Sequence, residues 1–516
     1  MSDVILKDLN FGEIDAKNEL LKDARLKTSY FADSFLKVDN VDFQSFEVGV
    51  QFFVIGLKGT GKTAVLRYFH EMQRQKGNFS EVVLFKSNVT EDDRQTLSNA
   101  SGYQIVDTDG EHSFHQDFKE PWKWYIYKRM TAALLKSGAA GAEIESLSKL
   151  TNQTSGRVGS LSKLFSSIKN GCLNVSGEVL GVSVELGITA ETSSEEIRVN
   201  ISDLNRACED LISEINFPCS VYLLFDELEL YHESDDKFDR DRRILRDLIS
   251  AITSVNAKMA EFEKPCVTCA ALRTEVINSV MEMGHEINRD IDDYGVVLTW
   301  DIGKERADHP LLNLIYKKIA KSCGVDECDV RKKFFPEKIN NQEFFAFILR
   351  ASYFRPRDIV RLLKVAREYD SKANSFSSAH FDETSTEYSK QTWIEITEEL
   401  QAVYSPAEIK AIEKLFLGFK ARFLKSELED RVLKRHRNDR PVQELVEKYS
   451  LSKILTDLYR IGVVGNDFVV RMRSGKPQYR TRFVFRGNTA LNDAERMMIH
   501  KSLWKHLTLI DERGAG

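Results

Sequence analysis

Short apolar runs alternate with helical stretches between residues 51 and 300 of this chain. Five of these runs have the length of buried strands: 51–55, 82–85, 219–225, 266–272 and 296–299. Residues 64–76 place apolar side chains at helical spacing, and a second helix is predicted at 203–215. Strands separated by helices are typical of a parallel sheet, so the pattern predicts an α/β fold.

Three later stretches depart from this alternation. Residues 136–195 are rich in glycine and serine and predict an insertion of loops with a hairpin near 173–200. Residues 309–370 have a helical pattern throughout. The polar residues 371–390 predict a linker to the C-terminal part of the chain.

The C-terminal part combines helices with a hairpin. Ser405, Pro406 and Glu408 form the capping signature of a helix start. Two further helices and two alternating strands are predicted after it: 424–436, 450–460, 468–473 and 479–485. Three helices followed by a β-hairpin resemble a winged helix.

Overall composition is that of a soluble globular protein. Hydrophobic residues make up 42% and charged residues 29%, which excludes a wholly disordered or collagen-like chain. No apolar run approaches the 18 or so residues of a spanning helix, and the first residues lack the pattern of a secretory signal. Seven cysteines, an odd number, favour reduced thiols and a cytoplasmic location.

Charge is unevenly divided along the chain. The whole chain carries a formal charge of −6, but residues 401–516 hold 23 basic and 14 acidic residues. That module therefore has a charge of +9 and the remainder −15. An acidic body with a basic module suggests a local nucleic-acid contact, with a solvated basic surface as the alternative.

Four arginines in the predicted hairpin could make that contact: Arg471, Arg473, Arg480 and Arg482. Because side chains alternate across a strand, each pair lies on one face of its own strand. If the two faces coincide, four guanidinium groups could bind the phosphates of duplex DNA. The alternative is a contact with the acidic body or with a protein effector.

The turn after the first strand carries the clearest chemistry. Residues 56–63 fit the pattern G-x-x-x-x-G-K-[ST] without a mismatch, between an apolar strand and an amphipathic helix. Backbone N–H groups of such a loop wrap around phosphates, and the following helix points its positive end at them. The predicted nucleotide-binding residues are Gly56, Lys58, Gly59, Thr60, Gly61, Lys62, Thr63 and Ala64.

Roles within this loop follow from its chemistry. Lys62 is predicted to bind the β- and γ-phosphates of ATP, and the Thr63 hydroxyl to bind Mg²⁺. The strand at 219–225 is followed by Asp226, predicted to hold Mg²⁺, and Glu227, predicted to activate the attacking water. ATP and Mg²⁺ are therefore the expected cofactors.

Three arginines are candidate sensors of the γ-phosphate. Arg273 follows the strand at 266–272, at the sheet edge where ligands of parallel sheets bind, with capping of a helix or pairing to Glu275 as the alternative. Arg355 and Arg357 flank Pro356, which starts a helix, and a cation in the first turn opposes the helix dipole. A bound triphosphate would explain Arg357 there; an ion pair is the alternative.

Together these motifs resemble bacterial P-loop ATPases related to the AAA+, STAND and KAP groups. The resemblance rests on Phe11–Glu19, Gly56–Thr63, Phe225–Glu227, Arg273–Val276 and Arg355–Asp358, and it covers about residues 1–370. It implies an ATPase core, a helical lid with a phosphate sensor at Arg355 or Arg357, and nucleotide-driven switching. KAP-like proteins often carry membrane helices between the two nucleotide motifs, whereas the 164-residue interval here is polar. Such ATPases are often linked to mobile elements or phage defence.

Four domains are expected from these patterns. They are a lead-in that packs on the core, a P-loop NTPase domain with the insertion, a helical lid with the linker, and a basic winged-helix-like domain: 1–48, 49–302, 303–395 and 396–516.

The predicted function is an ATP-hydrolysing switch that couples nucleotide state to DNA or partner binding. A slow or non-hydrolysing switch that recruits a protein effector is the alternative, and a P-loop phosphotransferase is a third. Arg240 or Arg243 could reach the ATP of a neighbouring copy, which leaves a homo-oligomer open.

Overall fold

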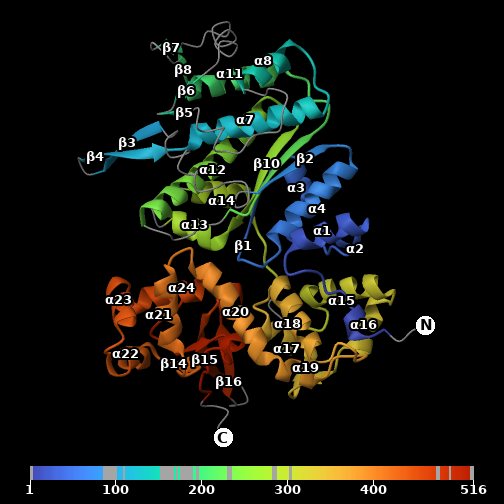
Figure 1. Ribbon diagram of the computed structural model, residues 1–516, viewed down its shortest axis with the longest axis vertical. Helices are drawn as coiled ribbons and strands as arrows, with labels where there is room; N and C mark the ends of the chain where they lie inside the picture. The colour runs from blue at the N-terminus through green and yellow to red at the C-terminus, as the bar shows by residue number, and fades with distance from the viewer. Residues whose placement is uncertain are drawn as a thin grey trace. The chain divides into compact units, whose positions relative to one another are not determined.

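A computed structural model describes the following residues: 4–84, 102–108, 111–151, 168–169, 172–174, 190–192, 197–228, 235–281, 287–301, 305–471, 477–486 and 490–511. The chain divides into two compact units. One unit holds the sheet, residues 39–55 and 62–297, and the other holds residues 1–38, 56–61 and 298–516. Figure 1 labels the elements of both.

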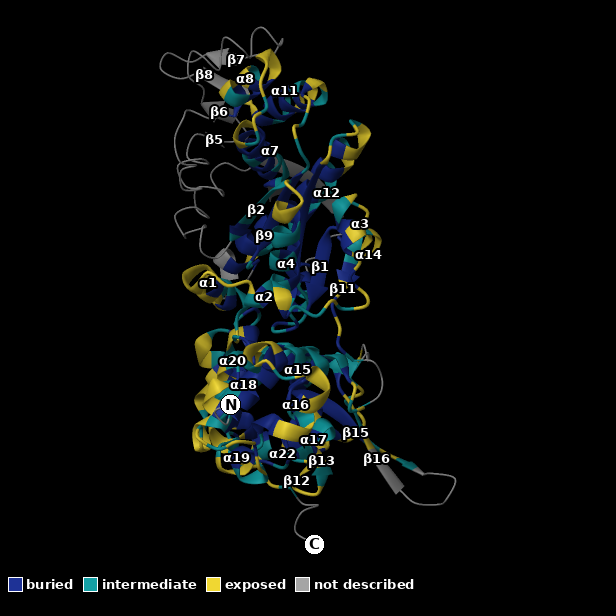
Figure 2. Cartoon of the chain, turned by 90° about the vertical axis from the view of Figure 1, so that its right-hand side faces the viewer, coloured by how far each residue is buried: buried dark blue, intermediate teal, exposed yellow. Residues whose placement is uncertain are grey.

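A five-stranded sheet forms the centre of the first unit (Figure 1). Its strands, in spatial order, are β11 (Gly295–Val297), β1 (Phe53–Gly56), β10 (Cys266–Arg273), β9 (Val221–Asp226) and β2 (Phe79–Leu84). Strand β1 pairs in parallel with β11, and β9 pairs in parallel with both β10 and β2. This P-loop-like order confirms the predicted α/β fold, and β1 and β9 are buried along their whole length (Figure 2).

Helices cover both faces of this sheet. Phe69 of α4 (Lys62–Gln75) packs edge-on against Tyr222 of β9, with ring centroids 5.1 Å apart. Trp122 of α7 (Lys119–Lys136) packs against Phe225 of the same strand. Residues 222 and 225 point to opposite faces because strand side chains alternate, so α4 and α7 lie on opposite sides of β9.

Other elements of this unit surround that centre. The helices are α3 (Phe43–Glu47), α8 (Ala142–Leu150), α11 (Ile201–Glu214), α12 (Asp235–Glu261), α13 (Thr274–Met281) and α14 (Asn288–Tyr294). The short strands are β3 (Gly102–Thr108), β4 (Glu111–Asp117), β5 (Ile168–Lys169), β6 (Cys172–Asn174), β7 (Ala190–Thr192) and β8 (Ile197–Asn200). Most of the predicted insertion at 136–195 lies outside the described residues.

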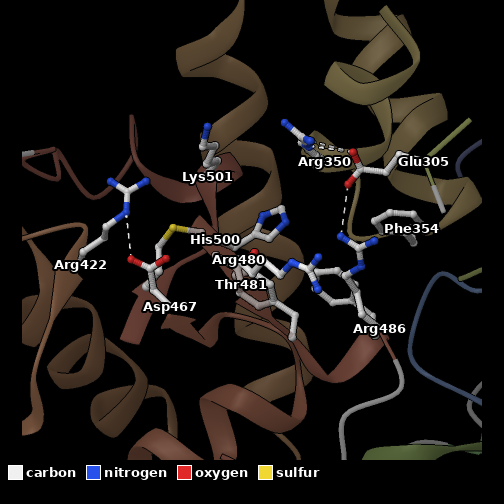
Figure 3. A pocket seen from close by; sticks show the side chains of 13 residues that line it. Glu305, Arg350, Phe354, Arg422, Asp467, Arg480, Thr481, Arg486, His500 and Lys501 are labelled. Carbon is white, nitrogen blue, oxygen red and sulfur yellow. Dashed lines mark hydrogen bonds and ion pairs between the residues drawn. The ribbon is translucent and has the colours of Figure 1, made fainter. Parts of the chain in front are cut away.

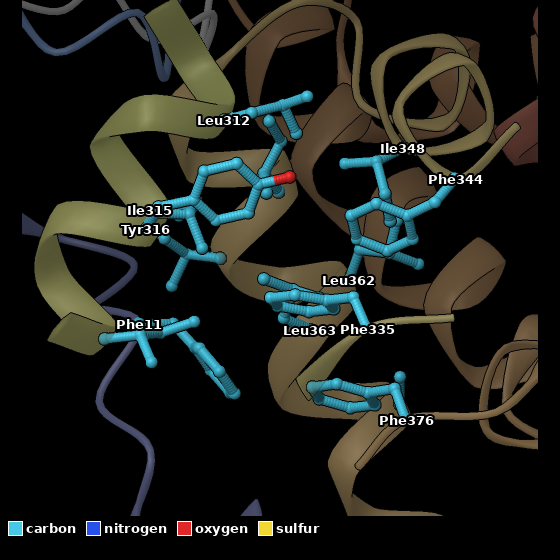
Figure 4. Packing of buried hydrophobic residues seen from close by; sticks show 14 of the residues in the cluster. Phe11, Leu312, Ile315, Tyr316, Phe335, Phe344, Ile348, Leu362, Leu363 and Phe376 are labelled. Atoms are coloured by element: carbon cyan, nitrogen blue, oxygen red, sulfur yellow. The ribbon is translucent and has the colours of Figure 1, made fainter. Parts of the chain in front are cut away.

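The second unit contains a helical region with its own core. Its elements are η1 (Leu6–Asp8), α1 (Ala16–Leu26), α2 (Tyr30–Asp33), α15 (Pro310–Cys323), α16 (Glu327–Phe334), α17 (Phe344–Ala351), α18 (Pro356–Tyr369), α19 (Ser378–Glu383) and α20 (Ser385–Leu400). Phe335 stacks on Phe376 with centroids 5.4 Å apart, and its ring lies 4.7 Å from that of Phe344 (Figure 4).

Two expectations for this region were wrong. Residues 309–370 are not helical throughout, because β12 (Lys338–Ile339) and β13 (Gln342–Glu343) form a hairpin. Asn340 and Asn341 have φ values of 49° and 60°, the left-handed pair that a tight hairpin turn requires.

Residues 371–390 are not a linker. Helix α19 and the start of α20 fill most of this stretch, and Phe376, Phe381 and Tyr388 are buried in the core. These three aromatic side chains anchor a segment whose average composition is polar, and the burial of large apolar groups outweighs that composition.

The C-terminal module has the predicted helices and hairpin. Its elements are α21 (Pro406–Phe416), β14 (Arg422–Phe423), α22 (Lys425–Lys434), α23 (Arg440–Lys448), α24 (Leu451–Arg460), β15 (Val464–Arg471), β16 (Pro477–Arg482), η2 (Val484–Arg486), β17 (Met497–Ile499) and η3 (Lys501–Leu503). The strands form one sheet in the order β14–β17–β15–β16. Helix α23 was not predicted, although Pro441 at its start is the usual first-turn signal.

None of the helices formed by the described residues is both long and apolar enough to cross a bilayer.

Candidate nucleotide site and its partners

The loop between β1 and α4 has the backbone that its glycines predict. Gly59 and Gly61 have φ values of +83° and +102°, which side chains with a Cβ atom rarely adopt. The indole N–H of Trp300 donates a 2.8 Å hydrogen bond to the Thr60 carbonyl oxygen and holds the middle of the loop. Helix α4 begins at Lys62, whose side chain is buried.

Thr63 and Asp226 meet although they lie far apart in the chain. The Thr63 hydroxyl donates a 3.2 Å hydrogen bond to Asp226 Oδ1, and the Glu227 N–H donates a 2.8 Å bond to the same oxygen. The other oxygen, Oδ2, is buried and receives no hydrogen bond within the described part of the chain. Burial raises the pKa of Asp226. A hydroxyl and a carboxylate with an unsatisfied oxygen are the hard ligands that Mg²⁺ prefers, so the donor set fits that ion.

Arg67 is a member of this cluster that the sequence analysis missed. It lies one helical turn after Thr63 on α4, and its positive charge counteracts the effect of burial on the pKa of Asp226. Its Nε atom is buried and meets no acceptor in the described residues. The i, i+4 spacing from Thr63 was the available signal, because such residues share a helix face.

Glu227 has an unusual backbone. Its φ of 60° lies in the left-handed region, where a residue other than glycine is held at a cost of about 1–3 kcal/mol. Such strain persists where the surroundings enforce it, and it occurs often at functional sites. The backbone at Glu227 is therefore held in a conformation that an unstrained residue would not adopt.

Arg273 stands at the end of β10, as predicted. Its Nη1 atom lies 3.6 Å from a carboxylate oxygen of the buried Glu275. The ion pair considered as an alternative is thus present in this conformation. Arg240 likewise pairs with its neighbour Asp241, at 2.8 Å.

Within the second unit, the phosphate loop contacts α18 and α20. A Cβ atom on Gly59 would lie 3.2 Å from Arg357 Cβ, so only glycine fits closely against this side chain. Lys58 Nζ lies 3.0 Å from Glu395 Oε1 and also pairs with Glu398. Arg357 Nη1 lies 2.6 Å from the same oxygen of Glu395.

Glu395 is the centre of this ion-pair network. Its second oxygen, Oε2, accepts a 2.7 Å hydrogen bond from Arg361. Burial alone would raise the pKa of Glu395, but Arg357, Lys58 and Arg361 together hold it far below its ordinary value of 4.5. Sequence reasoning missed Glu395, because acidic residues on a polar helix are usually a solvated face.

We expect Glu395→Gln to lower the free energy of unfolding by about 3–5 kcal/mol at neutral pH, because it leaves buried cations without their shared partner. The folded-state pKa of Glu395 lies below 4.5, so its stabilisation is complete above that pH and is lost as the pH falls through the folded-state pKa. Urea unfolding should therefore show a constant difference from the parent above about pH 5 that narrows below about pH 4.5.

Glu398→Gln is the matched control. Among the described residues Glu398 pairs with Lys58 only, and its side chain is 53% exposed, so its loss should cost less than about 1 kcal/mol. Equal losses for the two variants would contradict the central role of Glu395.

Arg355 is buried and binds residues outside the phosphate loop. The residue is 2% exposed, and its guanidinium donates to Glu399 Oε1 at 2.7 Å and to the Ile461 carbonyl oxygen at 3.1 Å. The two residues before it, Tyr353 and Phe354, have φ values of 49° and 51°. Tyr353 stacks on His500 at 3.7 Å, and this packing holds the strained turn that aims Arg355 at the C-terminal module.

The register of the hairpin decides where its arginines point. Arg480 lies opposite Phe468 and Arg482 opposite Asn466, whereas Arg471 lies opposite Pro477. Position 471 is therefore on the other face of the sheet from positions 480 and 482, so these three positions do not share one face. The side chain of Arg471 and the whole of Arg473 lie outside the described residues.

Comparisons with known proteins concern the helical region and the fold. Residues 309–397, from α15 into α20, match a family model described as the FunZ-associated C-terminal helical domain. That segment carries Arg355, Arg357 and Glu395. No curated relative matches the chain.

Among solved structures, forms of the RuvB Holliday junction branch migration motor of Thermotoga maritima align with it. One has 11% identity over 97% of this chain and 95% of that chain, with a TM-score of 0.29. A single-residue variant has 10% identity over 94% of this chain and 93% of that chain, with a TM-score of 0.29. Another variant has 10% identity over 90% of this chain and 91% of that chain, with a TM-score of 0.30. With such low scores, the fold assignment rests on the strand order of the sheet.

Proposed function

We propose that this chain is an ATP-binding and ATP-hydrolysing switch that couples nucleotide state to DNA or partner binding through its C-terminal module. The observation that carries the proposal is the contact between the Thr63 hydroxyl and Asp226 at 3.2 Å, with Asp226 Oδ2 buried and lacking a donor among the described residues. Thr63 is the last residue of a loop with the phosphate-binding pattern.

Each loop residue has a role in this proposal. The N–H groups from Gly59 to Ala64 would surround the phosphates, and Lys62 would bind the β- and γ-phosphate oxygens. Thr63 and Asp226 would hold Mg²⁺, which when bound neutralises charge on the phosphate oxygens. Glu227 would accept a proton from the attacking water at its carboxylate.

Arg357 and Lys58 would make the site a switch. Phosphate on the loop would place negative charge beside Gly59, against which Arg357 packs, and would compete with Glu395 for both cations. Helix α20 also supplies Glu399 to Arg355, which binds the Ile461 carbonyl after α24. A change at Glu395 could therefore reach the C-terminal module through one helix. Arg273, in the sheet unit, is proposed as a separate sensor of the γ-phosphate.

Duplex DNA is the partner we propose for the hairpin. Arg480 and Arg482 share one face and both are exposed. If each neutralises one phosphate, the logarithm of the binding constant should fall with a slope of about −1.8 against the logarithm of salt concentration.

Arg482→Glu should weaken duplex DNA binding about tenfold in low salt, because it replaces a phosphate contact by a repulsion. A band-shift titration at two salt concentrations measures this. Lys372→Glu, an exposed charge reversal outside the module, should leave binding unchanged. Equal binding by the Arg482→Glu variant and the parent would contradict DNA as the partner of the hairpin and favour a protein effector.

The alternative functions differ in whether phosphate is released from ATP and whether an acceptor is needed. A phosphotransferase would need an added acceptor, whereas a hydrolytic switch releases phosphate from ATP without one. A non-hydrolysing switch would bind ATP at Lys62 and release no phosphate.

A further inference from the structure

A pocket rich in positive charge lies within the second unit, lined by residues far in sequence from the phosphate loop. Its volume is about 520 Å³, within the range of small-molecule sites. Figure 3 shows its lining side chains, which come from the helical region and from the C-terminal module. Five of them are cationic: Arg350, Arg422, Arg480, Arg486 and Lys501.

One wall of this pocket is a face of the C-terminal sheet. Arg422 lies opposite Met498, and Asp467 lies opposite Thr481. Residues that face each other across paired strands point to the same side of a sheet, so these four share the face that lines the pocket. Arg350 of α17 and Phe354, just before the Arg355 turn, also line the pocket.

Carboxylates in and beside the lining pair with three of these cations. Glu305 pairs with Arg350 at 2.9 Å and with Arg486 at 3.2 Å, and Asp467 pairs with Arg422 at 3.3 Å. Asp511 also pairs with Arg422, and Asp301 lies 3.7 Å from Arg486. With these neighbours counted, five cations face four carboxylates, and the remaining positive charge favours an anionic ligand.

Lys501 is the cation best placed to receive such a ligand. In the described part of the chain no carboxylate lies within ion-pair distance of its ammonium, which lies 5.7 Å from the centre of the Trp504 ring. Crowding by protein around the amine and the charges of Arg350 and Arg422 lower its pKa. The imidazole of His500 beside it is buried and neutral, because burial lowers its pKa to about 3.

Aromatic rings complete the lining. Phe483 and Phe485 stack with centroids 5.1 Å apart, and Phe354 stacks on Phe485 at 6.0 Å. Guanidinium groups suit phosphate oxygens, and aromatic rings suit a flat apolar group. A nucleotide combines both features in a volume of this size.

We propose that this pocket binds a phosphorylated small molecule of the nucleotide class, with its phosphates at Lys501, Arg422 and Arg350. The site is separate from the phosphate loop and does not depend on ATP binding there. A ligand in it would join α17 to the C-terminal sheet, next to the turn that aims Arg355 at Ile461. It would thus stabilise one arrangement of the proposed switch.

The test is calorimetric titration of the full-length Lys62→Ala protein, in which the phosphate loop is disabled, with pyrophosphate and with ADP. We expect saturable binding of one molecule per chain. Adding Lys501→Glu should weaken it about tenfold or more, since a charge-assisted contact becomes a repulsion. Lys501→Gln should weaken it less, and Lys505→Glu, an exposed neighbour outside the pocket, should not change it.

Three results would overturn the proposal. The first is no binding of either probe to the Lys62→Ala protein. The second is binding that is unaffected by both Lys501 variants, which would place it elsewhere. The third is duplex DNA binding that is lost with Lys501→Glu while neither small probe binds, which would assign the pocket to nucleic acid. Loss of ATP binding in the Lys62→Ala protein concerns the phosphate loop and not this pocket. The titrations with pyrophosphate and ADP decide whether the pocket binds a phosphorylated ligand.

Discussion

Glu227→Gln is expected to lower ATP turnover by about 10²–10⁴-fold while ATP remains bound, because the amide cannot accept the proton of the attacking water. The substitution keeps the size of the side chain at this position, whose backbone φ is 60°. Phosphate release and nucleotide binding measured on the same preparation separate the two effects.

Glu263→Gln is a matched control for that experiment. Glu263 also has a left-handed backbone, with φ of 53°, but it is exposed and lies after α12. Its substitution should leave turnover unchanged. If Glu227→Gln retains full turnover, the general base is another residue and the proposed role of Glu227 is wrong.

Lys62→Ala is expected to weaken ATP binding by about 100-fold or more, because charge-assisted contacts to two phosphates are lost together. Hydrolysis should disappear with binding. Equilibrium titration with a fluorescent ATP analogue measures the affinity, and thermal unfolding without nucleotide reports whether the fold persists.

Lys128→Ala controls for the removal of a buried lysine. Lys128 of α7 has the same exposed fraction as Lys62, 8%, but it lies outside the loop. Truncation there should affect stability and not ATP affinity. Comparable loss of ATP binding in both variants would indicate a general defect and contradict the assignment of Lys62.

The parallel sheet and the phosphate loop could be predicted from the sequence because their determinants are local. Gly59 and Gly61 supply the required φ values, and the apolar runs give four of the five sheet strands to within two residues at each end. Asp226 could also be placed, because a carboxylate that ends a buried strand after such a loop meets the start of α4.

The partners of the sensing arginines could not be predicted in this way. The pairing of Lys58 and Arg357 with Glu395 joins segments far apart in the chain, and no periodicity specifies which acidic residue of α20 turns inward. The relative faces of Arg471 and Arg480 depend on the hairpin register, and a shift of one residue reverses them. The hairpin at Asn340 and Asn341 did have a local signal in its two asparagines.

Steady-state ATP hydrolysis by the parent chain, with and without duplex DNA, tests the central claim most directly. A switch that couples its nucleotide to the C-terminal module should release phosphate without an added acceptor. The rate should rise with DNA, and the activity should vanish in the Lys62→Ala and Glu227→Gln variants. Absence of phosphate release by the parent under both conditions, with Mg²⁺ present and ATP bound, would contradict the account.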